Sequence, residues 1–154
     1  MNIKIICFGK LDNKCFQESF DFYADKVKKR NDLEVIELKE EFNSELEVNK
    51  KNNCEILLNK LDKYQDYEKI VLDVNSKEVS SPELAEILMQ NKDFKGAKIL
   101  FIIGPSDGFT SDFKKQFQRI SFGKITLPHQ LFRVVLIEQI YRAIKINNNE
   151  KYHK

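Results

Sequence analysis

The sequence has few of the residues and runs that define several protein classes. Its three cysteines, Cys7, Cys15 and Cys54, are an odd number without a C-x-x-C pair, which predicts the reduced thiols of a cytosolic protein rather than a disulfide framework. No apolar run approaches the ~20 residues of a membrane span, and the first residues lack the layout of a signal peptide. We therefore expect a soluble, cytoplasmic protein without a membrane partner.

Histidine is also scarce, and nucleotide-binding fingerprints are missing. The two histidines, His129 and His153, lie far apart in the sequence without clustered carboxylates, so no metal site is predicted. The chain contains neither G-x-G-x-x-G nor the phosphate-binding loop of P-loop proteins. These absences argue against a dinucleotide-binding or NTP-binding enzyme.

The residues that are present indicate a globular chain with an uneven charge. Hydrophobic residues make up 42% and charged residues 32% of the 154 residues, which suits one domain spanning residues 1–154. The formal net charge is +2, but residues from Thr110 onward carry +6 and the preceding residues −4. This asymmetry indicates either a polyanionic partner at one face or the solvated surface of a lysine-rich protein.

Strand and helix patterns alternate along the chain. Apolar runs predict strands at residues 3–8, 33–38, 70–74, 98–103 and 124–127. Helical spacing predicts helices at residues 13–29, 42–63, 80–91, 109–120 and 130–146. Within the second helix, residues 50–53 are either helix or loop. The alternation predicts an α/β fold with a mostly parallel sheet and helices on both faces.

Three predicted strand ends are candidates for a binding site, because ligands on open parallel sheets bind beyond the carboxyl ends of the strands. They lie at Leu72-Asp73, at Ile103-Gly104 and around residues 124–128. Gly104-Pro-Ser-Asp-Gly108 lets the backbone approach a ligand, because glycine carries no Cβ atom. The same five residues are also typical of an ordinary turn.

The closing helix, residues 130–146, is apolar over most of its circumference. Glu138, Arg142 and Lys145 form a narrow polar stripe, in which Glu138 and Arg142 are spaced as an i, i+4 pair. A helix this apolar is buried on two sides, so we expect the sheet on one side and a second copy of the chain on the other. Arg133 projects from the apolar side and requires a structural salt bridge, a group of carbonyls or an anionic ligand.

Three stretches of the sequence resemble the RlmH family. They are residues 102–108 (Ile-Ile-Gly-Pro-Ser-Asp-Gly), residues 120–142 and the terminal Tyr152-His153-Lys154. The run from Thr126 to Arg142 and the Tyr-His ending are the most specific, whereas the N-terminal half is only loosely similar. Members of this family are SPOUT-class methyltransferases, which use S-adenosyl-L-methionine to methylate N3 of a pseudouridine in large-subunit ribosomal RNA.

The resemblance implies a fold, an assembly and a set of site residues. The fold is α/β with a C-terminal trefoil knot, and the assembly is an obligate homodimer with active sites at the subunit junction. The residues implied to line the cofactor pocket are Leu72, Gly104, Phe122, Gly123, Lys124, Ile125, Thr126 and Leu127. Those implied to face the ribosomal RNA are Arg142, Tyr152 and His153, with His129 as a lesser candidate.

The chain departs from the family's pattern where Ser76, Pro105 and Asn149 replace the usual glycines. Pro105 removes a backbone N–H and restricts Gly104. One alternative is therefore a non-catalytic ribosome-binding or assembly protein on the same fold. Another is a SPOUT RNA methyltransferase with a different target nucleotide.

Methylation at nitrogen requires a weakly acidic proton to leave the acceptor. We expect His153, or a water molecule that it orients, to accept this proton, because a neutral imidazole near physiological pH suits a base. Arg142 and Tyr152 would hold the nucleotide.

Overall fold

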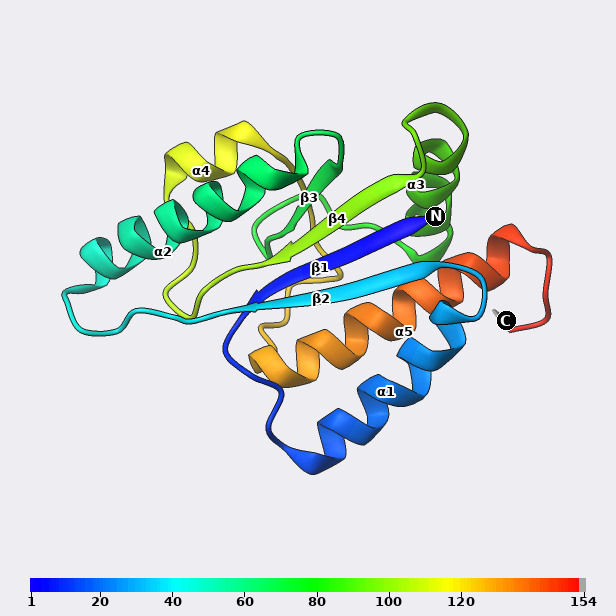
Figure 1. Cartoon of the computed structure of the whole chain (residues 1–154), viewed down its shortest axis with the longest axis horizontal. Coiled ribbons are helices and arrows are strands. Elements are labelled where there is room, and N and C mark those ends of the chain that lie inside the picture. Colours follow the sequence, from blue (N-terminus) through cyan, green and yellow to red (C-terminus); the bar gives the residue numbers. More distant parts are fainter. Residues whose placement is uncertain (153–154) are drawn as a thin grey trace.

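The structure, a computed structural model, describes residues 1–152 and contains one five-stranded sheet (Figure 1). The strands are β1 (Asn2–Phe8), β2 (Asp32–Leu38), β3 (Glu68–Leu72), β4 (Lys98–Ile103) and β5 (Gln118–Ile120). Neighbouring strands are all parallel, and their order is β2-β1-β4-β3-β5. The predicted α/β class with a parallel sheet is confirmed.

Helices cover both faces of this sheet, as predicted (Figure 1). One face carries α1 (Lys14–Lys28), α3 (Ser81–Phe94) and α5 (His129–Asn147). The opposite face carries α2 (Leu46–Leu61), which continues into the 3-10 turn η1 (Asp62–Tyr64), and α4 (Ser111–Gln116). Because the central strands are buried on both faces, they are apolar without alternation.

The start of α3 shows how local sequence fixes an element. The Ser80 side chain accepts a hydrogen bond from the Glu83 amide, and the Glu83 carboxylate accepts one from the Ser80 amide at 2.7 Å. With Pro82 in the first turn, these bonds satisfy amides that a helix leaves unpaired. The predicted helix start is therefore confirmed.

The segment after Thr110 differs from the prediction. The helix expected over residues 109–120 ends early, at Gln116, and residues 124–127 form no strand. The fifth strand is Gln118–Ile120, which pairs with residues 70–72 of β3. The spacing of Phe113 and Phe117 had predicted that residues 118–120 are helical. Their backbone groups are instead satisfied by pairing with the open edge of β3. Residues 124–127 become a loop instead, in which Ile125 is 79% exposed.

The closing helix α5 lies between α1 and α3 and packs against both. Its broad apolar surface is thus covered largely by its own chain, so that breadth alone does not require a second copy. Among the helices of residues 1–152, none is both long and apolar enough to cross a membrane.

Arg133 of α5 is 1% exposed and ties the start of the helix to the sheet. Its guanidinium donates hydrogen bonds to the carbonyls of Phe8 and Gly9 and forms an ion pair with Glu37 at 2.8 Å. The structural salt bridge and the carbonyl group, two of the three partners expected for this arginine, are both present. Their bonds place the first turn of α5 at the carboxyl edge of β1 and β2.

Candidate active site

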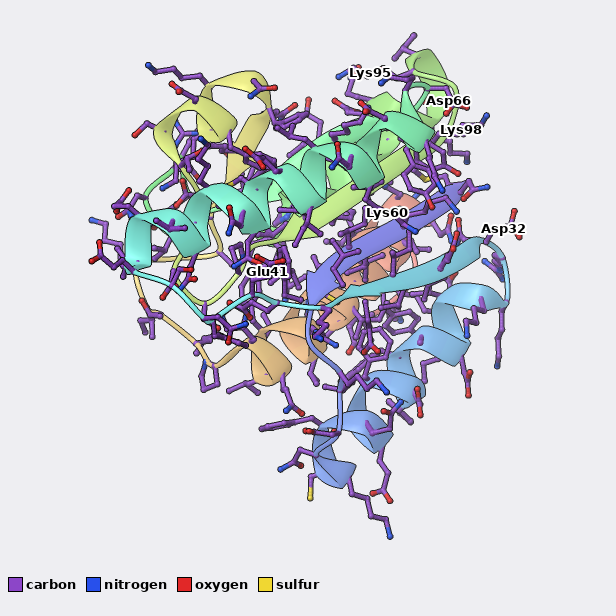
Figure 2. All side chains as sticks on the ribbon, turned by 60° about the vertical axis from the view of Figure 1, so that its left-hand side comes forward. Asp32, Glu41, Lys60, Asp66, Lys95 and Lys98 are labelled. Carbon is purple, nitrogen blue, oxygen red and sulfur yellow. The ribbon has the colours of Figure 1, made fainter. Side chains whose placement is uncertain are left out.

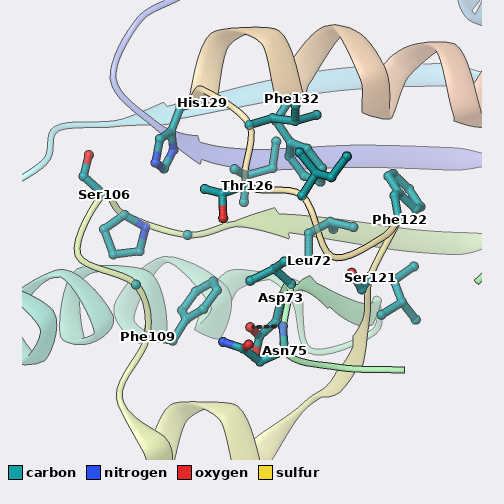
Figure 3. A pocket seen from close by; sticks show the side chains of 18 of the residues that line it. Leu72, Asp73, Asn75, Ser106, Phe109, Ser121, Phe122, Thr126, His129 and Phe132 are labelled. Carbon is teal, nitrogen blue, oxygen red and sulfur yellow. Dashed lines mark hydrogen bonds between the residues drawn. The ribbon is translucent and has the colours of Figure 1, made fainter. Parts of the chain in front are cut away.

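A cavity of about 620 Å³ opens at the carboxyl edge of the sheet (Figure 3). Its walls come mainly from three segments, residues 72–75 after β3, 103–109 after β4 and 120–127 before α5. Its volume is in the range of small-molecule sites. All the residues implied for the cofactor pocket line it, namely Leu72, Gly104, Phe122, Gly123, Lys124, Ile125, Thr126 and Leu127.

A glycine is required at residue 104 because the Phe109 ring packs closely against its backbone. A Cβ atom at this position would lie 2.6 Å from the ring atoms of Phe109. The Phe109 ring is itself stacked on Phe113, with 4.9 Å between centroids and 3° between planes, so it has little freedom to yield. Any side chain at residue 104 would therefore displace Phe109 or fill part of the cavity.

The wall before α5 is a tight turn held by Ser121. The Ser121 hydroxyl donates to the Gly123 carbonyl at 2.6 Å and accepts from the Gly123 amide at 3.1 Å. Ser121 also bonds through its backbone to Lys77 and Val79, each at 2.9 Å. Gly123 has a φ of 136°, a conformation that a residue with a side chain rarely adopts. These bonds fix the conformation of the turn at residues 121–123, which lines the cavity.

Asp73 joins the end of β3 to α4 and β5 through its carboxylate, and sequence reasoning had selected it only as a strand end. Its carboxylate is within 3.0 Å of Lys114 Nζ and 3.1 Å of Arg119 Nη1, and it accepts the Asn75 amide at 3.1 Å (Figure 3). Burial alone would raise the pKa of Asp73, but the hydrogen bonds from Lys114, Asn75 and Arg119 hold that pKa below its ordinary value. The side chain is therefore a carboxylate that fixes α4 and β5 against the end of β3.

A second polar cluster, the Arg142 cluster, joins Glu138 and Arg142 of α5 to Tyr152 beyond the helix. Glu138 Oε1 accepts hydrogen bonds from Arg142 Nε at 3.1 Å and Nη2 at 2.5 Å, and from the Tyr152 hydroxyl at 3.1 Å. The Arg142 guanidinium also lies over the Tyr152 ring, 4.7 Å from its centroid. The structure thus brings together two of the predicted RNA-facing residues. His153 lies outside the described residues.

The hydroxyl of Tyr152 is held in its protonated form. Burial raises its pKa above the ordinary value, and hydrogen bonding to Tyr23 and the charge of Glu138 raise it further. At neutral pH this residue donates a hydrogen bond and does not act as a base.

The two groups of predicted site residues are separated along α5. His129, at the first turn, lines the cavity. The α5 residues that line the cavity extend to Val135. Arg142 does not line it and is about 10 Å further along the axis, at a rise of ~1.5 Å per residue. One chain therefore contains the cavity and the Arg142 cluster, but does not bring them together.

The excess of basic residues after Thr110 is partly offset by carboxylates of the same chain. Seven of these cations lie within ion-pair distance of an acid: Lys114, Lys115, Arg119, Lys124, Arg133, Arg142 and Lys145. Because Asp112, Glu138 and Glu150 are already counted in the +6, only Glu37, Asp73 and Glu78 offset the excess, which leaves about half of the asymmetry in place. Within residues 1–152, no group of three or more metal-binding side chains gathers at one point.

Many proteins share a parallel sheet with a glycine-bordered cavity at its carboxyl edge. Comparison of the sequence with known protein families identifies the class of this protein. Residues 1–153 match the family described as "Predicted SPOUT methyltransferase". The chain belongs to this SPOUT methyltransferase family.

Several curated relatives share its full length and one name. The chain is 57% identical to "Ribosomal RNA large subunit methyltransferase H" of Mesoplasma florum and 58% identical to the protein of that name in Mycoplasma capricolum subsp. capricolum, with all of both chains covered. It is 40% identical to the protein of the same name in Caldicellulosiruptor saccharolyticus, over 99% of each chain. The resemblance read from the sequence motifs is therefore confirmed.

Proposed function

We propose that this chain is a cytoplasmic, single-domain enzyme that transfers a methyl group from S-adenosyl-L-methionine to N3 of a pseudouridine in large-subunit ribosomal RNA. One observation carries the proposal. The residues implied for the cofactor come from three separate segments, and all of them line one cavity. The names of the full-length relatives supply the class of substrate.

The residues of the cavity fit the proposed cofactor. When bound, S-adenosyl-L-methionine supplies a methyl group activated on a sulfonium. The missing Cβ of Gly104 leaves room beside Phe109, and the turn at Phe122–Leu127 offers backbone groups to a polar ligand. Pro105 lines the cavity without closing it, so the substitution that had favoured a non-catalytic protein leaves the pocket in place.

The acceptor nucleotide requires groups that hold it and a group that takes its proton. Arg142 and Tyr152 are suited to hold it. The guanidinium has N–H donors beyond those bonded to Glu138, and the Tyr152 oxygen, whose proton is donated to Glu138, can accept a hydrogen bond. We assign the proton acceptor to His153 or to a water molecule that it orients. His129, beside the cavity, is a lesser candidate for contact with the RNA.

The separation of the cavity from Arg142 supports a homodimer. A second copy placed with its α5 in the opposite direction would bring the Arg142 cluster of one chain to the cavity of the other. We infer that each active site is built this way, and that the C-terminal segment forms the trefoil knot of its family. The segment that would enter the knot begins at Ser121, whose backbone is hydrogen-bonded to Lys77 and Val79.

The proposal is tested by methylating ribosomes from a strain that lacks this modification and mapping the methylated base. Methylation of one pseudouridine at N3 is expected. A mark on another nucleotide would reassign the target, and failure of the folded protein to bind S-adenosyl-L-methionine in calorimetry would contradict an enzymatic role. Sedimentation should show a dimer at micromolar concentration, and a monomer would contradict the shared site.

A further inference from the structure

The loop Gly104–Gly108 has little internal support although each of its residues lines the cavity. Within it, the Gly108 amide bonds to the Pro105 carbonyl at 2.9 Å. Pro105 has no amide hydrogen to contribute. The conformation of this loop is therefore set from outside, by contacts with other segments.

Glu40, just beyond the end of β2, supplies one external contact. Its Oε1 accepts the Ser106 amide at 2.6 Å, and its Oε2 accepts the Ser106 hydroxyl at 3.2 Å. Two hydrogen bonds to one carboxylate are charge-assisted and fix direction as well as distance. They hold the middle of the loop.

Asn49, in the first turns of α2, supplies the next contact and is 6% exposed. Its amide donates to the Ser44 carbonyl at 2.9 Å and to Asp107 Oδ2 at 3.3 Å, while its oxygen accepts the Ser44 amide at 3.1 Å. A buried amide that uses both its donor and its acceptor is fixed in orientation. It therefore connects α2 rigidly to the loop.

The segment that carries Glu40 is itself anchored on α2. Asn53 is 0% exposed and bonds to both the amide and the carbonyl of Glu41, at 2.9 and 3.0 Å. Figure 2 labels Glu41 on the run that joins β2 to α2. Beyond the loop, the Thr110 amide bonds to Cys54 Sγ at 3.4 Å. α2 thus supports the cavity loop at several successive points.

We propose that Glu40 and Asn49 are positioning residues of the cofactor pocket. They hold residues 104–108 so that Gly104 stays against Phe109 and the loop does not close over the cavity. This proposal rests on the proposed function, because it gives the loop a cofactor to receive.

Glu40→Ala tests the first contact, with Glu41→Ala as a matched control. The Glu41 side chain bonds to Asn52 and not to the cavity loop. In calorimetry with S-adenosylhomocysteine, Glu40→Ala is expected to weaken binding about tenfold. Glu40→Gln retains an oxygen for the Ser106 amide and should recover most of that loss, whereas Glu41→Ala should stay within about twofold of wild type.

Asn49→Asp tests the second contact, because it places a carboxylate opposite Asp107. Binding should weaken about tenfold through like-charge repulsion. Adding Asp107→Asn returns a donor to the pair and should recover part of the affinity. Unfolding midpoints of the same variants show whether a loss of binding reflects only a loss of stability.

Several outcomes would overturn the proposal. One is Glu40→Ala binding as tightly as Glu41→Ala, and another is no recovery when Asp107→Asn is added. A wild-type protein that does not bind the ligand would contradict the proposed function instead. In that case hydrogen exchange without ligand tests whether Glu40 holds the loop. Glu40→Ala should speed exchange of the Ser106 amide about tenfold, and an unchanged rate would refute the positioning role.

Discussion

The cavity and the Arg142 cluster are built in opposite ways. The cavity is made of loops and glycine positions, in which the carboxylate of Asp73 fixes α4 and β5 against the end of β3 and the carboxylate of Glu40 bonds to Ser106. The Arg142 cluster is made of side chains on one helix and the tail that follows it. All the residues implied for the cofactor line the cavity of one chain, whereas the Arg142 cluster does not border that cavity. Under the proposed function, the cofactor half of the site belongs to the monomer and the substrate half depends on assembly.

The largest expected effect comes from Gly104→Val. The added side chain would overlap the Phe109 ring, whose nearest atoms are 2.6 Å from the position of the Cβ. Overpacking of this kind should weaken S-adenosylhomocysteine binding about 100-fold in calorimetry. Combining the milder Gly104→Ala with Phe109→Leu removes the ring and should bind more tightly than Gly104→Ala alone. Wild-type affinity in Gly104→Val would show that the cofactor lies elsewhere.

Arg142→Ala should separate the two regions. Ribosome methylation is expected to fall about 30-fold in kcat/KM, because a charged hydrogen-bond donor to the nucleotide is lost. Cofactor affinity should fall much less, because Arg142 is assigned to the nucleotide and the residues that line the cavity are unchanged. Lys145→Ala, which removes a neighbouring cation paired with Glu150, is the matched control. A parallel loss of cofactor affinity in Arg142→Ala would contradict the separation.

Asp73→Asn should have a smaller effect, on stability. The Asp73 side chain is 5% exposed, but its partners Lys114 and Arg119 are 25% and 35% exposed. We therefore expect a loss of about 2 kcal/mol in the free energy of unfolding, less than for a fully buried pair. Asp112→Asn, where the carboxylate is 93% exposed, should cost less than ~0.5 kcal/mol.

The effect of Asp73→Asn should depend on pH. The folded pKa of Asp73 lies below its ordinary value, so its contribution is complete above the unfolded pKa of ~3.9 and is lost as the pH falls through the folded pKa. Denaturant unfolding should show the full difference between wild type and variant at pH 7 and a shrinking one below pH ~4. A difference that stays constant down to low pH would mean that the carboxylate charge is not responsible.

Local sequence predicted those parts of the fold that depend on local physics. The long apolar runs gave β1 and β4, and the Ser80 cap gave the start of α3. β5 was not predicted, because its three residues form a strand only by pairing with the edge of β3, which is distant in the sequence. Residues 50–53, which were either helix or loop, are helical. Asn53 can be buried there because its side chain bonds to the backbone of Glu41.

The candidate site likewise contains residues that the sequence predicted and residues that it did not. The strand-end rule and the family resemblance located the residues around Leu72, Gly104 and Phe122–Leu127, which line the cavity. Asp73 was noticed only by position, and Glu40 and Asn49 were missed. Glu40 bonds to a residue 66 positions away and Asn49 to one 58 positions away, so no local pattern could reveal them. An acidic residue directly after a buried strand was the one available signal for Asp73.

The most direct test of the shared site is complementation between two inactive variants. Subunits with Gly104→Val and subunits with Arg142→Ala are co-expressed, and ribosome methylation is compared with that of each variant alone. If each site joins the cavity of one chain to the Arg142 cluster of the other, the mixed dimer has one intact site. Random pairing should then restore about a quarter of wild-type activity. A mixture no more active than its better component would show that cavity and cluster act within one chain.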